Sequence, residues 1–311
     1  MPIVGFLSTL TEDDFGHLLT AFKNGLCNNL HTPKTCVGSG HNVPTSLGAN
    51  DVFIQTRWTK GVYGPTLKNA AGDLVRSRPA VIAATGGVVS AKAAESKTRT
   101  IPIVFLSGRT KNQEHDDHPA NTAGIWLGNT KYAVEKLGRH EILKELFEFT
   151  RLEIFNLIHK QSIVFDDEKD WTNAIVVTNG IEKGFDKAFD EILKCRARAL
   201  TISADSFFTT RNKVIVKFAN ERFNKPVCYP FREYVEHGGL MSYGPNLADA
   251  YRSLGLEAAQ IINEGLTGKT IGRLKKPAKV ELRLVANRAT ANAQLGSAEA
   301  QKLLGAAHDV I

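Results

Sequence analysis

The sequence predicts an α/β protein made of two similar lobes, each a doubly wound parallel sheet. Short β-branched runs alternate with stretches of helical periodicity up to residue 106. A polar segment without any period, residues 107–122, then interrupts the pattern, and the same alternation resumes after it. The length of 311 residues agrees with two lobes, because a single hydrophobic core rarely grows beyond about 250–300 residues.

The first half of the chain consists of successive strand and helix signals. Residues 3–8 form a β-branched run. The acidic residues 12–14 are typical of the first turn of a helix, and apolar residues then recur on one helical face from Phe15 to Leu26. The same step recurs in expected strands at 52–58, 80–84 and 101–106 and expected helices at 67–75 and 88–97. Repeated steps of this kind imply parallel strands joined by right-handed crossovers.

The second half repeats this order of elements. The expected strands are 123–127, 154–159, 174–178, 199–203 and 227–229, and the expected helices are 132–149, 185–193 and 206–223. Since both halves show the same alternation, we expect two lobes of similar design.

The residues after Gly238 do not begin a third domain. They predict a helix at 247–266, a strand at 279–285 and short helices up to the C-terminus. We therefore expect them to return to the two existing lobes, which joins the lobes by a multi-strand hinge. The predicted N-terminal lobe is residues 1–120 plus about 244–275, and the predicted C-terminal lobe is residues 121–243 plus about 276–311.

Charge and hydropathy exclude two classes of function. The formal net charge is +7, but the basic residues are scattered, and the densest run, Lys269–Lys279, has no aromatic residue and no DNA-binding pattern. We therefore predict no binding to nucleic acid. No stretch approaches 18 apolar residues, so we expect a soluble protein without membrane insertion. Residues 3–7 read as a first strand rather than an export signal, which fits a cytoplasmic protein or a mature or trimmed chain.

The common catalytic motifs are missing from the sequence. It has no Gly-x-Ser-x-Gly elbow, no phosphate-binding loop and no His-Glu-x-x-His helix, so we predict no enzyme and no cofactor. The run His115–His118 contains two His and two Asp, but four successive loop residues rarely all turn toward one metal ion. We interpret it as a solvated loop and predict no metal site. His159, Lys160 and Asp205 are weak candidates for a catalytic acid or base.

The cysteines leave the redox state open. Cys27 and Cys36 are nine residues apart and could close a loop through a disulfide. Cys195 and Cys228 fall on an expected helix and an expected strand. One disulfide and four reduced thiols are both compatible with this spacing.

The candidate ligand-binding residues follow the expected strands. In open parallel sheets, a ligand lies beyond the carboxyl ends of the strands. Hydroxyls, glycines and aromatic rings dominate there, which suits the binding of a small polar molecule better than catalysis. The candidates are Ser8, Thr9, Trp58, Thr85, Gly86, Gly87, Ser107, Trp126, Asp205, Ser206, Phe207 and Tyr243.

Several of these candidates have a second interpretation. Thr85–Gly87 leads from a strand into a helix, so its backbone N–H groups could bind a carboxylate or phosphate, or its glycines could only form a tight turn. Asp205 could bind an ammonium group or cap the following helix. Trp58, Trp126 and Tyr243 could stack on a ligand ring or pack in the core.

One segment carries a specific family resemblance. Residues 233–252, EYVEHGGLMSYGPNLADAYR, closely resemble a signature of the ABC-transporter substrate-binding family that includes tryptophan-binding lipoproteins. The further pieces that look like this family, in the same order, are Val4–Ser8, Phe22–Leu26, Arg57–Trp58, Asp73–Val75, Arg78–Ile82, Thr100–Phe105 and Ala199–Phe208. At residues 107–110, Ser-Gly-Arg-Thr replaces the family's Gly-Asp-Pro-Val. The loss of that acidic residue favours an anionic ligand.

The resemblance implies a bilobed, periplasmic-binding-protein-like fold of type 1. It implies a solute-binding receptor of an ABC importer, which closes on a small carboxylate-bearing ligand, such as an aromatic amino acid, and delivers it to an ABC permease. We expect a monomer in the periplasm or otherwise outside the cytoplasm, its export signal removed or trimmed. Two alternatives stay open: a cytoplasmic ligand-sensing domain without a DNA-binding headpiece, and a Rossmann-like enzyme acting on a nucleoside or a sugar.

Overall fold

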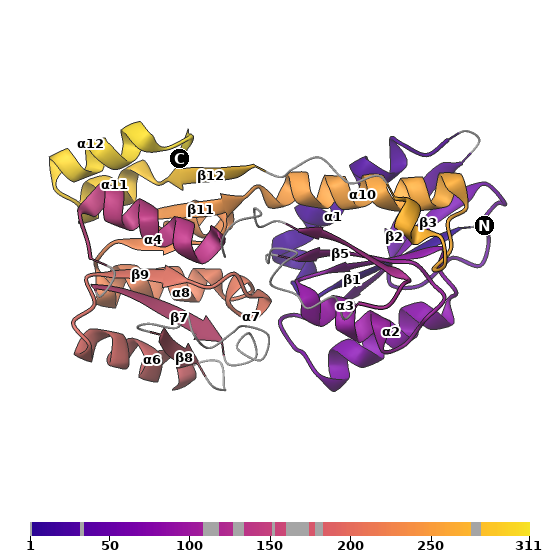
Figure 1. Cartoon of the computed structure of the whole chain (residues 1–311), viewed down its shortest axis with the longest axis horizontal. Coiled ribbons are helices and arrows are strands. Elements are labelled where there is room, and N and C mark those ends of the chain that lie inside the picture. The colour runs from indigo at the N-terminus through magenta and orange to yellow at the C-terminus, as the bar shows by residue number, and fades with distance from the viewer. Residues whose placement is uncertain are drawn as a thin grey trace. The chain divides into compact units, whose positions relative to one another are not determined.

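The chain divides into two compact units (Figure 1). The computed structural model describes residues 2–31, 34–107, 118–126, 134–150, 153–159, 174–177, 183–274 and 281–311. Unit 1 is Met1–Leu127 with Leu247–Val280, and unit 2 is Gly128–Asn246 with Glu281–Ile311. Because each unit combines two stretches of chain, the backbone passes between the units three times. Each unit is built around its own sheet with helices, so the predicted class of two α/β lobes is confirmed.

Unit 1 contains a parallel sheet. Within the described residues it has six strands in the order β2-β3-β1-β4-β5-β6, and every neighbouring pair is parallel. The strands are β1 (Ile3–Ser8), β2 (Thr35–Gly40), β3 (Asp51–Trp58), β4 (Val81–Thr85), β5 (Ile103–Ser107) and β6 (Thr122–Trp126). Since both faces are covered by helices, β1 is buried from Val4 to Ser8.

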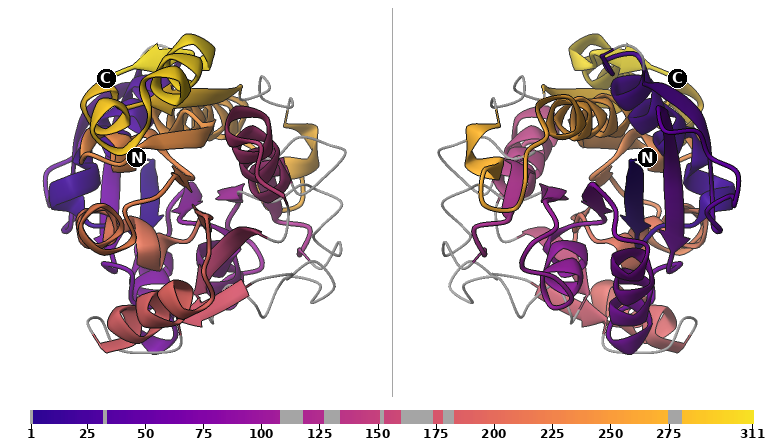
Figure 2. Two further views of the ribbon diagram at one scale, coloured as in Figure 1. Left: turned by 90° about the vertical axis from the view of Figure 1, so that its left-hand side faces the viewer. Right: turned by 90° about the vertical axis from the view of Figure 1, so that its right-hand side faces the viewer.

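Four helices cover this sheet. They are α1 (Glu12–Cys27), α2 (Pro65–Arg76), α3 (Val88–Glu95) and α10 (Leu247–Glu264). Helices α1 and α10 lie on one face, and α2 and α3 lie on the other, as Figures 1 and 2 show. A 3-10 turn, η5 (Ile271–Arg273), follows α10. Residues Leu247–Val280 therefore belong to unit 1.

Two strands of unit 1 differ from the expectation. The strand expected to open the second lobe, residues 123–127, instead joins the first sheet, where β6 pairs with β5. Periodicity predicts a strand but does not indicate which sheet the strand joins. The polar segment 107–122 therefore does not mark the point at which the second sheet begins. Strand β2 lies in a stretch, residues 31–50, that is rich in Gly, Asn, Pro and Ser and carries no strand signal.

Unit 2 contains a mixed sheet. Its described strands have the order β13-β12-β11-β10-β9-β7-β8, parallel except for β12 against β11. They are β7 (Ile154–His159), β8 (Ala174–Val177), β9 (Ala199–Ile202), β10 (Val227–Tyr229), β11 (Met241–Pro245), β12 (Leu282–Ala286) and β13 (Asp309–Val310).

The helices of unit 2 differ from the expectation in one region. The helix expected at 206–223 is divided into α7 (Ser206–Thr209), α8 (Asn212–Phe218) and a π-helical turn, η4 (Ala219–Phe223). The other described helices are α4 (Val134–Phe147), α6 (Lys183–Lys194), α9 (Arg232–Glu236), α11 (Arg288–Gln294) and α12 (Ser297–Ala306). Among the described helices of both units, none has the length and apolar character needed to cross a membrane.

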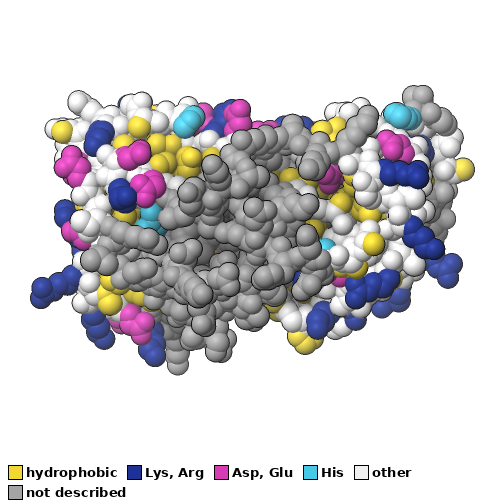
Figure 3. Space-filling view, viewed as in Figure 1, with side chains coloured by type: hydrophobic (Ala, Val, Ile, Leu, Met, Phe, Trp, Pro, Cys, Tyr) yellow, Lys and Arg dark blue, Asp and Glu magenta, His cyan; other side chains and the backbone are white. Residues whose placement is uncertain are grey.

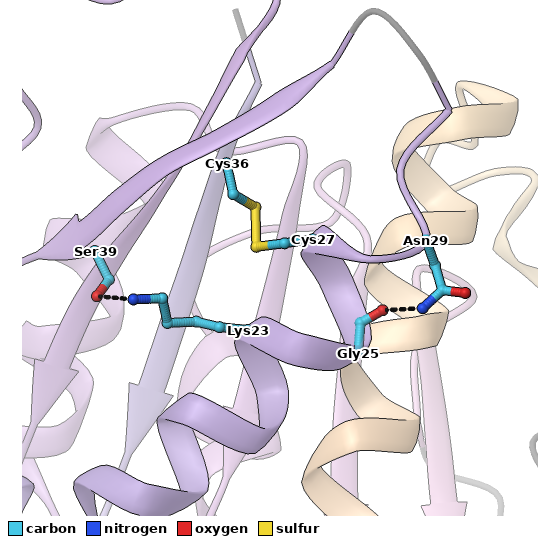
Figure 4. Close-up of a disulfide and its surroundings, with 6 residues drawn as sticks. All are labelled: Lys23, Gly25, Cys27, Asn29, Cys36 and Ser39. Atoms are coloured by element: carbon cyan, nitrogen blue, oxygen red, sulfur yellow. Dashed lines mark hydrogen bonds between the residues drawn. A yellow bond between two sulfur atoms is a disulfide. The ribbon is translucent and has the colours of Figure 1, made fainter.

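A disulfide joins Cys27 at the end of α1 to Cys36 on the edge strand β2 (Figure 4). The two Cα atoms are 5.5 Å apart. Nearby, Lys23 Nζ donates a hydrogen bond of 3.4 Å to Ser39 Oγ, which also links α1 to β2. The cysteine pairing that the sequence left open is therefore a disulfide, and Cys195 and Cys228 are free thiols.

Helices α1 and α10 touch through their backbones. A Cβ atom added to Gly25 would lie 2.0 Å from the carbonyl oxygen of Arg252, and one added to Gly255 would lie 2.2 Å from the carbonyl oxygen of Phe22. Real side chains do not fit at such distances, so these two glycines set the spacing of the two helices.

We predict that Gly25→Ala lowers the free energy of unfolding by about 1–3 kcal/mol, because the added methyl group overlaps the backbone of α10. Gly16→Ala is the matched control in the same helix, since a Cβ there meets nothing within 4 Å. The control should be neutral or stabilising by about 0.5–1 kcal/mol. Urea unfolding measures both, and equal stability of the two variants would contradict the close approach.

A carboxyl group is buried in α10. The side chain of Glu257 is 5 % exposed, and its Oε2 has no hydrogen-bond partner among the described residues. Burial raises the pKa of Glu257 to about 8 from 4.5. The folded state therefore binds more protons than the unfolded state between these two pH values, so stability falls as the pH rises from about 4.5 to 8.

We predict that Glu257→Gln removes most of this pH dependence. The wild type should lose up to about 1.4 kcal/mol of unfolding free energy per pH unit through this group, and the variant should not. Thermal unfolding at pH 5 and pH 8 tests the difference. The variant should gain in melting temperature over the wild type at pH 8, and a gain of the same size at pH 5 would contradict the assignment.

Candidate functional site

Five predicted residues lie at one edge of the sheet in unit 1. Ser8, the last residue of β1, pairs with Trp58 of β3 on one side and with Thr85 of β4 on the other. Further along, Ser107 of β5 pairs with Trp126 of β6. These residues end parallel strands, so they share the carboxyl edge at which α/β sheets bind ligands.

The ends of β1 and β3 are tied together by their backbones. The Thr59 N–H donates to the Ser8 carbonyl oxygen at 2.9 Å, and the Lys60 N–H donates to the Leu10 carbonyl oxygen at 3.2 Å. The Ser8 hydroxyl accepts a hydrogen bond of 3.2 Å from the Leu10 N–H and is fully buried. Ser8 therefore stabilises the turn after β1, in which the Thr9 carbonyl oxygen accepts a hydrogen bond from the Gly61 N–H.

Three buried donors at these two strand ends lack partners. The Thr9 Oγ1, Trp58 Nε1 and Thr59 Oγ1 atoms are buried and have no hydrogen-bond partner within the described part of the chain. The Trp58 ring packs against Phe6, with 5.4 Å between ring centroids. An unpaired buried donor costs about 1–3 kcal/mol, so a cluster of three marks a place where polar atoms of another molecule are expected. Sequence reasoning missed Thr59, although it directly follows Trp58.

The turn between β4 and α3 is open to an approaching group. Gly86 and Gly87 have φ angles of 95° and 90°, a region that favours glycine, so the tight-turn interpretation is correct. A Cβ added to Gly87 would meet no described atom within 4 Å. There is therefore space beside the first residues of α3, where the helix dipole favours negative charge.

The hydroxyl of Thr85 has a structural role. It donates to the Leu7 carbonyl oxygen at 3.2 Å, and the Thr85 carbonyl oxygen accepts from Ser90 Oγ at 2.7 Å. Thr85 is fully buried, like Thr9, but its donor is used. Thr9 and Thr85 therefore have the same side chain, but only the Thr85 hydroxyl has a hydrogen-bond acceptor among the described residues.

In unit 2, the predicted residues at 205–207 open a helix. The Asp205 carboxylate accepts a hydrogen bond of 2.8 Å from the Phe207 N–H and caps α7. Phe207 stacks on Phe185 with 5.9 Å between centroids, and the Arg211 guanidinium lies 3.9 Å above the ring of Phe207. Ser206 is buried within the same helical turn. The helix-capping role of Asp205 is therefore present in the structure.

Two further polar groups complete the description of unit 2. The Ser203 hydroxyl, at the end of β9, is buried and has no partner among the described residues, and the sequence did not indicate it. Tyr243 of β11 is half-buried, and its ring packs on Gly138 of α4, where an added Cβ would lie 2.6 Å from the ring. Burial raises the pKa of Tyr243. Its ring thus packs between β11 and α4.

Several sequence candidates lie outside the described residues. These are the side chains of Ser107, Trp126 and His159, together with Lys160 and residues 115–117 of the acidic His115–His118 run. His118 is described, and its ring pairs with the buried carboxylate of Glu95 and lies against Phe105. In the described part of the chain, no three His, Cys, Asp or Glu side chains are grouped for a metal ion.

Comparisons with known proteins identify the fold. No protein-family model and no curated protein matches the sequence. A structure titled as the ABC domain of Streptococcus pneumoniae in complex with L-Trp aligns with 100 % of this chain and 99 % of its own, at 15 % identity and a TM-score of 0.72. A conserved domain protein from Vibrio cholerae has the same coverage, at 18 % identity and a TM-score of 0.71.

A third structure is an ABC-transporter solute-binding protein from R. palustris in complex with 4-hydroxybenzoate. It covers 98 % of this chain and 84 % of its own, at 12 % identity and a TM-score of 0.52. All three identities are low, so they carry information on the fold alone. The chain therefore has the same two-lobed α/β fold as these structures.

Proposed function

We propose that this protein is a solute-binding receptor that takes up a small aromatic carboxylate for an ABC permease. The observation that carries the proposal is the cluster of unpartnered donors at the carboxyl edge of unit 1, Thr9 Oγ1, Trp58 Nε1 and Thr59 Oγ1. Hydroxyl and indole N–H groups donate hydrogen bonds, and carboxylate oxygens only accept them. A carboxylate is therefore the ligand group that satisfies all three donors.

The neighbouring turn supports an anionic ligand group. Strand β4 lies directly beside β1, so the glycine turn at Gly86–Gly87 is at the strand end next to Thr9, whereas Trp58 and Thr59 are at the end of β3, on the other side of β1. The positive end of the helix dipole adds to the preference for a carboxylate.

An aromatic ligand is supported by the residues and by the comparisons. The Trp58 indole N–H is at the same edge, with its ring packed against Phe6. Two solved structures with this fold are complexes with L-Trp and with 4-hydroxybenzoate, each an aromatic carboxylate.

The disulfide supports a location outside the cytoplasm. Structural disulfides persist in oxidising compartments and are rare in the cytosol, and Cys27–Cys36 fits the first environment. This favours the receptor over the cytoplasmic sensor. The enzyme alternative has less support, because none of the edge residues Ser8, Thr9, Trp58, Thr59 and Thr85 can act as an acid or base near neutral pH.

A ligand screen tests the proposal. We expect L-Trp, L-Phe or 4-hydroxybenzoate to raise the melting temperature, because a ligand that binds only the folded state stabilises it by mass action. The corresponding amides, which lack the carboxylate, should give a smaller shift. A shift with nucleosides or sugars and none with aromatic carboxylates would refute the ligand class.

Thr9→Val tests the site with an internal control. The substitution removes an unpaired hydroxyl at constant shape, so the ligand-free protein should be as stable as the wild type or more stable, while ligand affinity should fall about tenfold. Thr85→Val should instead destabilise the ligand-free protein by about 1 kcal/mol, because its hydroxyl already donates to Leu7. Unchanged ligand affinity in Thr9→Val would place the carboxylate elsewhere.

A further inference from the structure

One segment of unit 1 is rich in basic residues. Residues 57–100 contain eight Lys or Arg residues and only two acidic residues, Asp73 and Glu95. This segment alone contributes +6 to a chain whose net charge is +7. The basic residues of this segment are separated in sequence, and the fold brings several of them together.

The structure places several of these cations beside one another. Lys68, Gly72 and Arg76 are four residues apart on α2 and share one face of that helix. Lys97, which follows α3, lies over Gly72, where an added Cβ would be 3.7 Å from Lys97 Cε and 3.9 Å from the Arg76 guanidinium. Figure 3 shows Lys and Arg side chains gathered over the region in which Figure 1 draws α2 and α3.

Two arginines extend this surface along the amino edge of the sheet. Arg78 precedes β4 and Arg99 precedes β5, and these strands are neighbours. Both side chains are exposed. We call Lys68, Arg76, Arg78, Lys97 and Arg99 the basic face. It lies on α2, after α3 and at the amino edge, whereas the proposed ligand site lies at the carboxyl edge.

The acidic residues nearby pair with only one residue of the basic face, Arg76. Asp73 pairs with Arg57 and Arg76, and the buried Glu95 pairs with Lys92 and His118. No described carboxylate forms an ion pair with Lys68, Arg78, Lys97 or Arg99. The basic face therefore carries uncompensated charge that is free to attract an anionic partner.

The residue composition of the basic face indicates which kind of partner it can bind. Interfaces between proteins have an apolar centre with aromatic anchors. Within residues 65–100, no large hydrophobic side chain is exposed, and the described exposed ones lie elsewhere: Val37, Val62, Leu193, Val214, Leu256, Val310 and Ile311. A bilayer with anionic headgroups needs no apolar centre, because clustered Lys and Arg bind it through charge alone.

We infer that the basic face binds anionic phospholipid headgroups and holds unit 1 against a membrane surface. Binding of this kind is peripheral and inserts no apolar side chain. It is screened by salt, because the charges on both sides are exposed to solvent. It is also independent of the ligand, because none of the five residues belongs to the proposed ligand site.

Vesicle binding tests the inference. The wild type should co-sediment with phosphatidylcholine vesicles that contain phosphatidylglycerol and not with phosphatidylcholine alone, and high salt should release it. The variant Lys68→Glu/Arg76→Glu/Lys97→Glu should bind at least about tenfold more weakly, since each basic residue near the surface contributes about fivefold. Circular dichroism melting shows that the variant remains folded.

The matched control changes the same charge on unit 2. Lys187, Lys194 and Lys217 are exposed, and Lys187→Glu/Lys194→Glu/Lys217→Glu should retain most of the vesicle binding. An equal loss in both triple variants would mean that net charge alone drives binding, which would overturn the inference. Absence of vesicle binding at low salt would also overturn it, and so would retention on double-stranded DNA without binding to vesicles.

Discussion

The parallel pairing of β1 with β3 and β4 is the constraint on which the candidate site depends. It places Ser8 between Trp58 and Thr85, so three side chains that are far apart in sequence end at the same edge. Because helices cover both faces of the sheet, polar groups at this edge can be buried and still be accessible to a ligand. The unpartnered donors after β1 and β3 follow from the same pairing. They cost stability in the empty protein and are useful only when a ligand supplies acceptors.

The sequence predicted the fold class and the strand ends, because β-branched runs and helical periodicity are local properties. It could not predict that β6 joins the first sheet, since the partner of a strand depends on contacts far along the chain. For the same reason it could not distinguish Thr9 from Thr85. Both follow or end a buried strand, but only the fold brings the Leu7 carbonyl oxygen within reach of Thr85. The disulfide could not be predicted from the sequence either, because it depends on the proximity of α1 and β2 in the fold.

The two units differ in whether the candidate ligand residues already have structural partners. In unit 2, Asp205 caps α7 and Phe207 lies between Phe185 and Arg211, so these predicted ligand residues already have structural partners. In unit 1, the donors at the carboxyl edge are held by backbone pairing and have none. Such rigid, unsatisfied groups favour specificity, because a ligand that lacks the matching acceptors leaves them buried and unpaired.

The contact between α1 and α10 also determines the order in which the two units can fold. Helix α1 begins at residue 12, but the helix that covers its glycine-lined side ends only at residue 264. During synthesis, unit 1 exposes the apolar flank of α1 until residue 264 has left the ribosome, and by then residues 128–246 of unit 2 are already available to fold. The N-terminal unit is thus completed late, and its folding must close a sequence separation of more than two hundred residues.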